Sequence, residues 1–187
     1  MRTFIAVKIL PTPRLIKSIV EIREELAKEK IKWAETHNLH LTLRFLGDTN
    51  PETAAIISKS LEKIKSQVPP FSFIIKGTGV FPGTRAPRVL WMGIEEFEGL
   101  EFLKKHIDPL MEARGLEQED RPFKPHLTLG RIKHLGDREK LKALLQKHAQ
   151  MFQKVMVNEF IYYESVLTPD GPVYKEIGKY RLAGNLS

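Results

Sequence analysis

The chain has no cysteine among its 187 residues. This absence excludes a disulfide framework, a thiolate nucleophile and a cysteine-ligated zinc site. No apolar run approaches the roughly 18 to 20 residues that a membrane-spanning helix needs. The opening residues 1–8 are interrupted by charge too early for a secretory signal peptide. Because such a chain suits a reducing compartment, we expect a cytoplasmic location.

Basic residues outnumber acidic ones, with 30 Lys and Arg against 23 Asp and Glu, for a formal charge of +7. This excess favours a polyanionic partner, and nucleic acid is the first candidate. A basic surface that serves only solubility would explain the charge equally well on its own. Glu and Lys are abundant while Asn and Gln are scarce, which leans toward a thermophilic source.

The tetrapeptide His-Leu-Thr-Leu occurs twice, at 40–43 and at 126–129. Side chains alternate between the two faces of a β-strand, so each copy would place its histidine and threonine opposite its leucines. Two such strands side by side would bring two imidazoles and two hydroxyls into one cleft. Imidazole titrates near neutral pH, so the pair can serve as an acid and a base around one leaving group. One copy alone is easily a chance strand fragment, but two identical copies favour a functional site.

Hydrophobic periodicity and turn residues predict strands and helices interspersed along the chain. The predicted strands cover 3–10, 32–34, 38–46, 71–80, 88–94 and 126–132, followed by a closing hairpin of 155–167 and 173–177. The predicted helices cover 13–30, 50–67, 96–113 and 137–150. The order looks duplicated, which predicts an α+β fold of two facing lobes, each an antiparallel sheet with helices on its outer face. No linker rich in Gly or Ser separates the halves, so we expect residues 1–187 to form a single domain, by default a monomer.

The two motif segments resemble a known family. They read His-Leu-Thr-Leu-Arg-Phe-Leu-Gly at 40–47 and Pro-His-Leu-Thr-Leu-Gly-Arg at 125–131. Both are similar to the motifs of the two-histidine phosphoesterases, specifically the RNA 2',3'-cyclic phosphodiesterases also named 2'-5' RNA ligases. The opening residues 2–6 and the late residues 164–167 match as well, so the resemblance spans nearly the whole chain.

The resemblance implies a bilobal fold in which the two sheets are related by pseudo-twofold symmetry. It also implies hydrolysis of a terminal 2',3'-cyclic phosphate on RNA to a 2'-phosphate, with no metal or other cofactor. Some members of the family join tRNA halves through a 2'-5' bond, so tRNA halves are among the implied partners.

The residues alone fit this chemistry. A cyclic phosphodiester opens when water attacks phosphorus in line and one ribose oxygen leaves, so the reaction needs a base and an acid. His40 and His126 would supply them, and the Thr42 and Thr128 hydroxyls would hydrogen-bond the nonbridging oxygens. The near symmetry of the copies leaves the two proton roles open. The family resemblance leans toward His40 as the acid to the 3'-oxygen and His126 as the base to water.

Two arginines are further candidates for phosphate binding. The guanidinium of Arg131 can hold phosphate bidentately. Strict alternation places it on the face opposite His126, unless Gly130 permits a bulge that re-aims it. Arg44 has the parity of the first motif's threonine and could line the cleft, or be an ordinary strand residue.

Three aromatic residues could contact a base, since unpaired RNA is read by stacking. Phe123 stands in a proline-flanked loop ahead of the second motif and is the predicted stacking residue. Phe45 shares its parity with Leu43, which favours core packing. Tyr174 could reach the rim of the groove or be a plain sheet residue.

Two other functions remain open. One is an RNA-binding module that keeps the basic groove but performs no chemistry. The other is a metallohydrolase, suggested by the spacing of His37 and His40. That spacing suits a helix better than a strand, and no carboxylate or cysteine pattern completes the ligand set.

Overall fold

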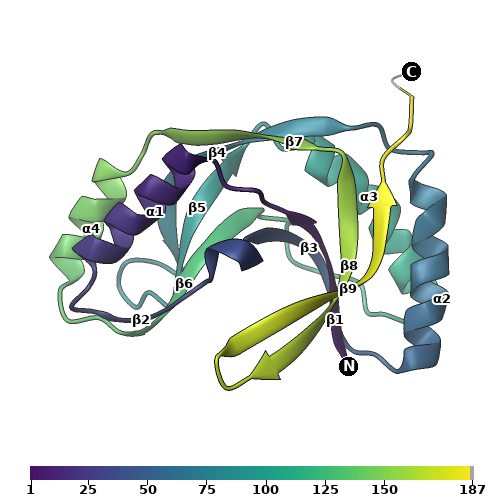
Figure 1. Cartoon of the computed structure of the whole chain (residues 1–187), viewed down its shortest axis with the longest axis horizontal. Helices are drawn as coiled ribbons and strands as arrows, with labels where there is room; N and C mark the ends of the chain where they lie inside the picture. Colours follow the sequence, from purple (N-terminus) through teal and green to yellow (C-terminus); the bar gives the residue numbers. More distant parts are fainter. Residues whose placement is uncertain (186–187) are drawn as a thin grey trace.

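The computed structural model describes residues 1–185, which contain nine strands and four α-helices (Figure 1). The strands are β1 (Arg2–Lys8), β2 (Lys30–Trp33), β3 (His40–Asp48), β4 (Phe71–Phe81), β5 (Val89–Glu95), β6 (His126–His134), β7 (Met151–Val157), β8 (Glu159–Thr168) and β9 (Gly171–Arg181). The helices are α1 (Pro13–Glu25), α2 (Pro51–Leu61), α3 (Glu98–Glu112) and α4 (Arg138–Lys147), with short 3-10 turns at Thr36–Asn38 and Glu62–Ile64.

The strands form two antiparallel sheets, one in the order β3-β1-β8-β9 and the other in the order β2-β6-β5-β4-β7. Helices α2 and α3 pack against the first sheet, and α1 and α4 against the second (Figure 1). Apart from the edge strand β2, the second sheet repeats the order of the first, with β6, β5, β4 and β7 in place of β3, β1, β8 and β9. The predicted α+β architecture of two pseudosymmetric sheets is therefore confirmed.

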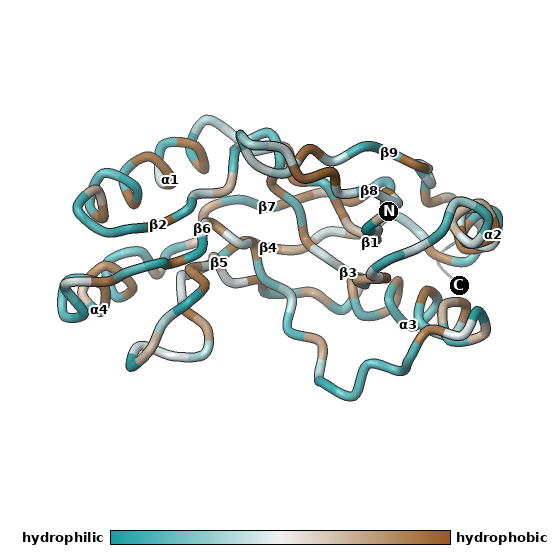
Figure 2. The backbone as a smooth tube through the Cα atoms, turned by 90° about the horizontal axis from the view of Figure 1, so that it is seen from below, coloured by the Kyte–Doolittle hydropathy of each residue, from teal (hydrophilic) through white to brown (hydrophobic). Residues whose placement is uncertain are grey.

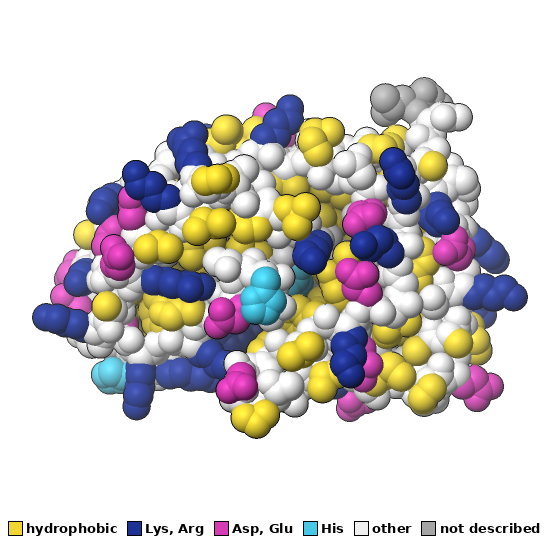
Figure 3. Space-filling model, viewed as in Figure 1, with side chains coloured by type: hydrophobic (Ala, Val, Ile, Leu, Met, Phe, Trp, Pro, Cys, Tyr) yellow, Lys and Arg dark blue, Asp and Glu magenta, His cyan; other side chains and the backbone are white. Residues whose placement is uncertain are grey.

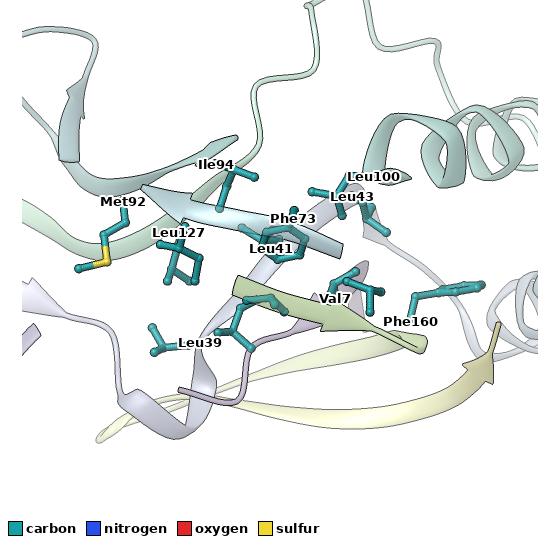
Figure 4. Close-up of a cluster of buried hydrophobic side chains, with 14 of the residues drawn as sticks. Val7, Leu39, Leu41, Leu43, Phe73, Met92, Ile94, Leu100, Leu127 and Phe160 are labelled. Carbon is teal, nitrogen blue, oxygen red and sulfur yellow. The ribbon is translucent and has the colours of Figure 1, made fainter. Parts of the chain in front are cut away.

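Neither lobe is built from one half of the chain. The chain crosses between the sheets several times, since β1 and β3 lie in the first sheet, β2 and β4 in the second, and β8 again in the first. The buried apolar side chains of both sheets form one large cluster, which contains Leu41 and Leu43 from β3 and Leu127 from β6 (Figure 4). Because the motif leucines share this core, packing fixes the two motif strands relative to each other.

The helices begin where capping residues predict. The side chains of Thr12, Asn50 and Asp137 each accept a hydrogen bond from the backbone N–H three residues on. Helix α1 ends at Glu25 rather than at the predicted residue 30, because Lys30–Trp33 pairs with β6 as strand β2. Within residues 1–185, no helix is both long and apolar enough to cross a membrane.

The closing hairpin differs from its prediction. The segment predicted as one strand, 155–167, belongs to two strands in different sheets, β7 and β8, which are separated only at Asn158. Its residues are largely buried on both sides of this break, so hydrophobicity alone gives no sign of the change of sheet. The hairpin itself consists of β8 and β9. It turns at Pro169 and Asp170, and Gly171, whose φ is 119°, begins β9 and pairs with Thr168.

Candidate active site

The two motif strands meet where the two sheets adjoin. β3 and β6 contact each other, and their patterns of burial are the same at all nine positions. In each strand the histidine and threonine are half-buried while the two leucines are buried. The structure thus turns His40, Thr42, His126 and Thr128 away from the apolar core on which the leucines pack.

Both imidazoles are held by the same kind of hydrogen bond to the backbone. Nδ1 of His40 lies 2.7 Å from the carbonyl oxygen of Asn38, and Nδ1 of His126 lies 2.8 Å from that of Lys124. A carbonyl only accepts hydrogen bonds, so Nδ1 carries the proton in each ring. This fixes the tautomer and leaves Nε2 of both histidines to take or give a proton.

Aromatic rings flank each imidazole. The His40 ring lies 5.1 Å from that of Phe4 and 5.0 Å, edge-on, from that of Tyr174. The His126 ring lies 5.0 Å, edge-on, from that of Phe81. Nothing in the motifs indicates these partners, which come from β1, β9 and β4, far apart in the sequence. They restrict the rings to few orientations, as a proton-transfer site requires.

Burial lowers the pKa of His40 below its ordinary value, because desolvation disfavours the charged ring. The positive charge of His126 lowers this pKa further, while the hydrogen bond to the Asn38 carbonyl raises it. The two imidazoles therefore lie close enough to influence each other electrostatically. A positive charge on the His126 ring therefore disfavours a positive charge on His40.

A bulge lies at the last residue of the motif in β6. Trp91 of β5 pairs with Thr128, but its neighbour Leu90 pairs with Gly130, so Leu129 is an extra residue. The extra residue reverses the alternation, and Arg131 is exposed while Gly130 is buried. The predicted bulge that re-aims Arg131 is thus present in the structure, with its extra residue next to Gly130.

Arg131 also lies near the opposite lobe. Its positive charge lowers the pKa of the Tyr174 hydroxyl on β9, although burial, the larger effect, raises that pKa overall. The guanidinium therefore acts electrostatically on the hydroxyl of the residue that flanks His40. This location suits phosphate binding between the lobes, a role that stays a prediction.

β3 carries the same bulge, and it overturns two expectations from strand parity. Ala6 pairs with Thr42 and Ile5 with Arg44, so Leu43 is the extra residue. Arg44 is only 2% exposed and turns into the interior, where Nη1 lies 3.0 Å from Asp108 Oδ1. It does not line the cleft.

Phe45, expected in the core, is instead 66% exposed, and its ring lies 6.1 Å from that of Phe4. It therefore stands on the histidine side of β3. Phe123 is half-buried and packs against the main core, with Nζ of Lys104 5.5 Å from its ring centroid. Its role in stacking a base stays a prediction.

A small cavity of about 60 Å³ adjoins His40 and is lined in part by Asn38, Tyr163 and Tyr174. It has room for a few water molecules but not for a nucleotide. A larger hollow of about 480 Å³ lies beside α2, with Ala55 and Lys59 in its wall, and neither histidine lines it. Residues 1–185 contain no group of three or more His, Cys, Asp or Glu side chains placed to hold a metal ion. His37 is exposed in the turn before β3.

The doubled site has a counterpart in a known family. A model described as "LigT like Phosphoesterase" matches residues 9–91 and 94–174, and each range contains one His-Leu-Thr-Leu motif. The chain belongs to the LigT-like phosphoesterases. In this phosphoesterase the two matches together take in β2 through β8 except for Met92 and Gly93 of β5, so membership extends over both sheets.

Curated relatives of this phosphoesterase match it over nearly full length. The RNA 2',3'-cyclic phosphodiesterase of Aquifex aeolicus is 39% identical over 176 residues, which cover 90% of this chain and 93% of the relative. That of Thermotoga maritima is 35% identical over 188 residues, covering 100% and 98%.

Solved structures agree with the fold. The TT0787 protein of Thermus thermophilus aligns with a TM-score of 0.81 at 30% identity, over 100% of both chains. E. coli LigT complexed with 3'-AMP aligns with a TM-score of 0.75 at 24% identity, over 97% of both chains, and supports the fold alone.

Proposed function

We propose that this phosphoesterase hydrolyses terminal 2',3'-cyclic phosphates of RNA to 2'-phosphates without a metal ion. The observation that carries the proposal is the matched pair of imidazoles. Each is fixed by a backbone carbonyl at Nδ1, each leaves Nε2 for proton transfer, and the two are close enough to interact. The names of the curated relatives support the same activity.

The reaction needs two proton transfers around one phosphorus. Nε2 of His126 takes a proton from water, whose oxygen attacks phosphorus in line. The bond between phosphorus and the 3'-oxygen breaks, and Nε2 of His40 gives that oxygen its proton. The product carries a 2'-phosphate and a free 3'-hydroxyl. The hydroxyls of Thr42 and Thr128 donate hydrogen bonds to the nonbridging oxygens as their negative charge is redistributed.

The lowered pKa of His40 has a consequence for its acid role. The ring is mostly neutral near pH 7 in the free protein. A bound phosphodiester brings a negative charge beside the ring, which raises the pKa of a histidine. His40 therefore gains its proton as substrate binds and holds it for the departing 3'-oxygen.

The surface around the site suits RNA. On the face in Figure 3, Lys and Arg side chains gather at the lower left, in the region of β2. Lys30 and Lys32 of β2 are exposed, and Lys32 pairs with Arg131 across the strands. These charges extend from the cleft along β2 and β6. They can bind the phosphates of an RNA chain beyond its terminal phosphate. Phe45 and Phe123 are the aromatic residues available to stack on a base.

The finer proposal is reversible 2'-5' joining of RNA ends such as tRNA halves. The same two imidazoles can activate a 5'-hydroxyl in place of water, so that it attacks the cyclic phosphate and releases the 3'-oxygen. A non-catalytic RNA-binding module would need neither of the fixed tautomers, and their presence on both strands favours catalysis.

The deciding experiment is phosphorus NMR on a small 2',3'-cyclic nucleotide incubated with the protein and excess EDTA. We expect complete conversion to the 2'-phosphate. Formation of the 3'-phosphate would overturn the assigned regiochemistry. Loss of turnover in EDTA with recovery on zinc or manganese would replace the proposal by a metallohydrolase, and saturable RNA binding without turnover would replace it by a binding module.

A further inference from the structure

A long loop precedes the second motif and determines how His126 is held. Residues 113–125 form neither helix nor strand between α3 and β6, and they run as a mainly hydrophilic arc below β3 in Figure 2. The carbonyl that fixes Nδ1 of His126 belongs to Lys124, near the end of this loop. The orientation of the His126 ring therefore depends on how the loop is anchored.

The loop is anchored on buried cations. Nη2 of Arg44 donates to the carbonyl oxygen of Glu117 at 2.5 Å, and Nζ of Lys104 lies 2.5 Å from Glu119 Oε2. Phe123 packs on the core with the Lys104 ammonium 5.5 Å from its ring centroid. The anchors at 117, 119 and 123 lead directly to Lys124.

Lys104 occupies the centre of this cluster. It is 8% exposed, although lysine is rarely buried without a reason. Its three N–H donors have three acceptors, namely Leu43 O at 2.9 Å, Asp108 Oδ1 at 3.1 Å and Glu119 Oε2. The first acceptor is the bulged residue of β3, which has no strand partner in the pairing with β1. One ammonium group thus connects the strand of His40 to the loop of His126.

The carbonyl that fixes His40 is held by different residues. The side-chain amide of Asn38 donates to the carbonyl oxygen of Pro172 at the β8–β9 hairpin, and the backbone carbonyl oxygen of Asn38 accepts from His40 Nδ1. The two carbonyls that fix Nδ1 of His40 and Nδ1 of His126 are therefore held by separate contacts. This separation makes it possible to disturb one ring and leave the other unchanged.

We propose that Lys104 is a positioning residue for His126: through Glu119 and Phe123 it holds the loop whose Lys124 carbonyl fixes the His126 tautomer. The effect on rate rests on the proposed function, but the effect on the ring does not. Lys104 touches neither imidazole, and it acts through the loop.

The test measures the ring nitrogens of both histidines by nitrogen NMR in the wild type and in Lys104→Met, which keeps the apolar stem and removes the ammonium. In the wild type, both neutral rings should show a protonated Nδ1. In Lys104→Met, the His126 signals should move toward the mixture of tautomers found in free imidazole, and those of His40 should stay. The kcat on a small cyclic nucleotide should fall on the order of tenfold, with KM nearly unchanged, since ring orientation and not binding is lost.

Three further variants complete the test. Glu119→Gln keeps the shape of the loop contact and stays informative if Lys104→Met does not fold, and it should show the same change at His126. Asn38→Ala should alter the His40 signals and spare those of His126. Lys147→Met removes an exposed lysine that pairs with Glu25 on the outer side of the other lobe, and it should change neither ring.

The outcomes separate the two proposals. Unchanged His126 signals in folded Lys104→Met or Glu119→Gln would overturn the positioning role, whatever the rate. The predicted change at His126 in a protein without cyclic phosphodiesterase activity would uphold the positioning role and overturn the function. Equal disturbance of both rings would show a general loss of structure and would also overturn the proposal.

Discussion

Phe45 and Arg131 occupy equivalent positions in β3 and β6, each two residues beyond the extra residue of a bulge. In both strands the bulge returns this position to the histidine face, where the side chain is exposed. The backbone is pseudosymmetric at this point, but one lobe presents an aromatic ring and the other a guanidinium. A symmetric scaffold thus offers a nucleotide two different contacts, one for a base and one for a phosphate.

This asymmetry predicts different losses in two variants. Phe45→Ala should raise KM for a dinucleotide cyclic phosphate by the factor that corresponds to about 1–3 kcal/mol of lost stacking free energy. It should hardly affect inhibition by inorganic phosphate. Arg131→Ala should weaken both. Steady-state kinetics would show the difference. Phe102→Ala, at an exposed phenylalanine on α3, and Lys147→Ala, at an exposed lysine on α4, are the matched controls and should leave KM unchanged. An equal loss of phosphate inhibition in both variants would refute the division.

The histidines should be individually essential. His40→Ala and His126→Ala should each lose on the order of 10²–10⁴ in kcat, since each removes one positioned proton-transfer group. The double variant should be little worse than the weaker single variant, because groups that act as a unit are not additive. Circular dichroism would show that the variants are folded. Substantial turnover by either folded single variant would refute the two-histidine mechanism.

The pKa of His40 also predicts a pH dependence of stability. Because this pKa is lowered in the folded protein, the unfolded chain binds the proton more tightly. The neutral ring therefore contributes stability that is present above the ordinary pKa, about 6.5, and is lost as pH falls through the lowered folded value. His40→Gln should lose less free energy of unfolding than the wild type between about pH 7.5 and pH 5. Urea titrations at both pH values would measure this, and identical losses would contradict the shift.

Sequence alone predicted that the motif histidines and threonines face away from the core, because strand alternation is local and the motif is repeated. The position of Arg131 could also be predicted, because Gly130 indicated a possible bulge. The bulge at Leu43 had no such signal. Strict alternation therefore placed Arg44 and Phe45 on the wrong faces, because the bulge depends on the pairing of β3 with β1, which the sequence of β3 alone does not show. The ion pair of Arg44 with Asp108 joins residues 64 positions apart, beyond the reach of any periodic pattern.

Gly130 offers a test of the second bulge. A Cβ at this position would lie 2.7 Å from Cγ2 of Ile31 and 3.1 Å from Cε3 of Trp33, both on β2. Gly130→Ala should therefore destabilise the protein by about 1–3 kcal/mol, the usual result of overpacking, and displace Arg131. Gly136→Ala is the control, since its Cβ would meet only Glu29 oxygens at 3.8 Å. Equal free energies of unfolding for the two variants in urea titrations would show that β2 moves to accommodate the added methyl group without loss of stability.

The proton roles can be separated with a substrate whose 3'-oxygen is replaced by sulfur. Sulfur is a far better leaving group and departs with little protonation, so an enzyme without its general acid should recover much of its rate. An enzyme without its general base should not, because water still has to be activated. We expect rescue of His40→Ala and none of His126→Ala, measured as the ratio of kcat on the thio and oxygen substrates. Rescue of His126→Ala alone would exchange the two roles. Rescue of neither would mean that the lost imidazole acts by electrostatics or positioning rather than by protonating the leaving group.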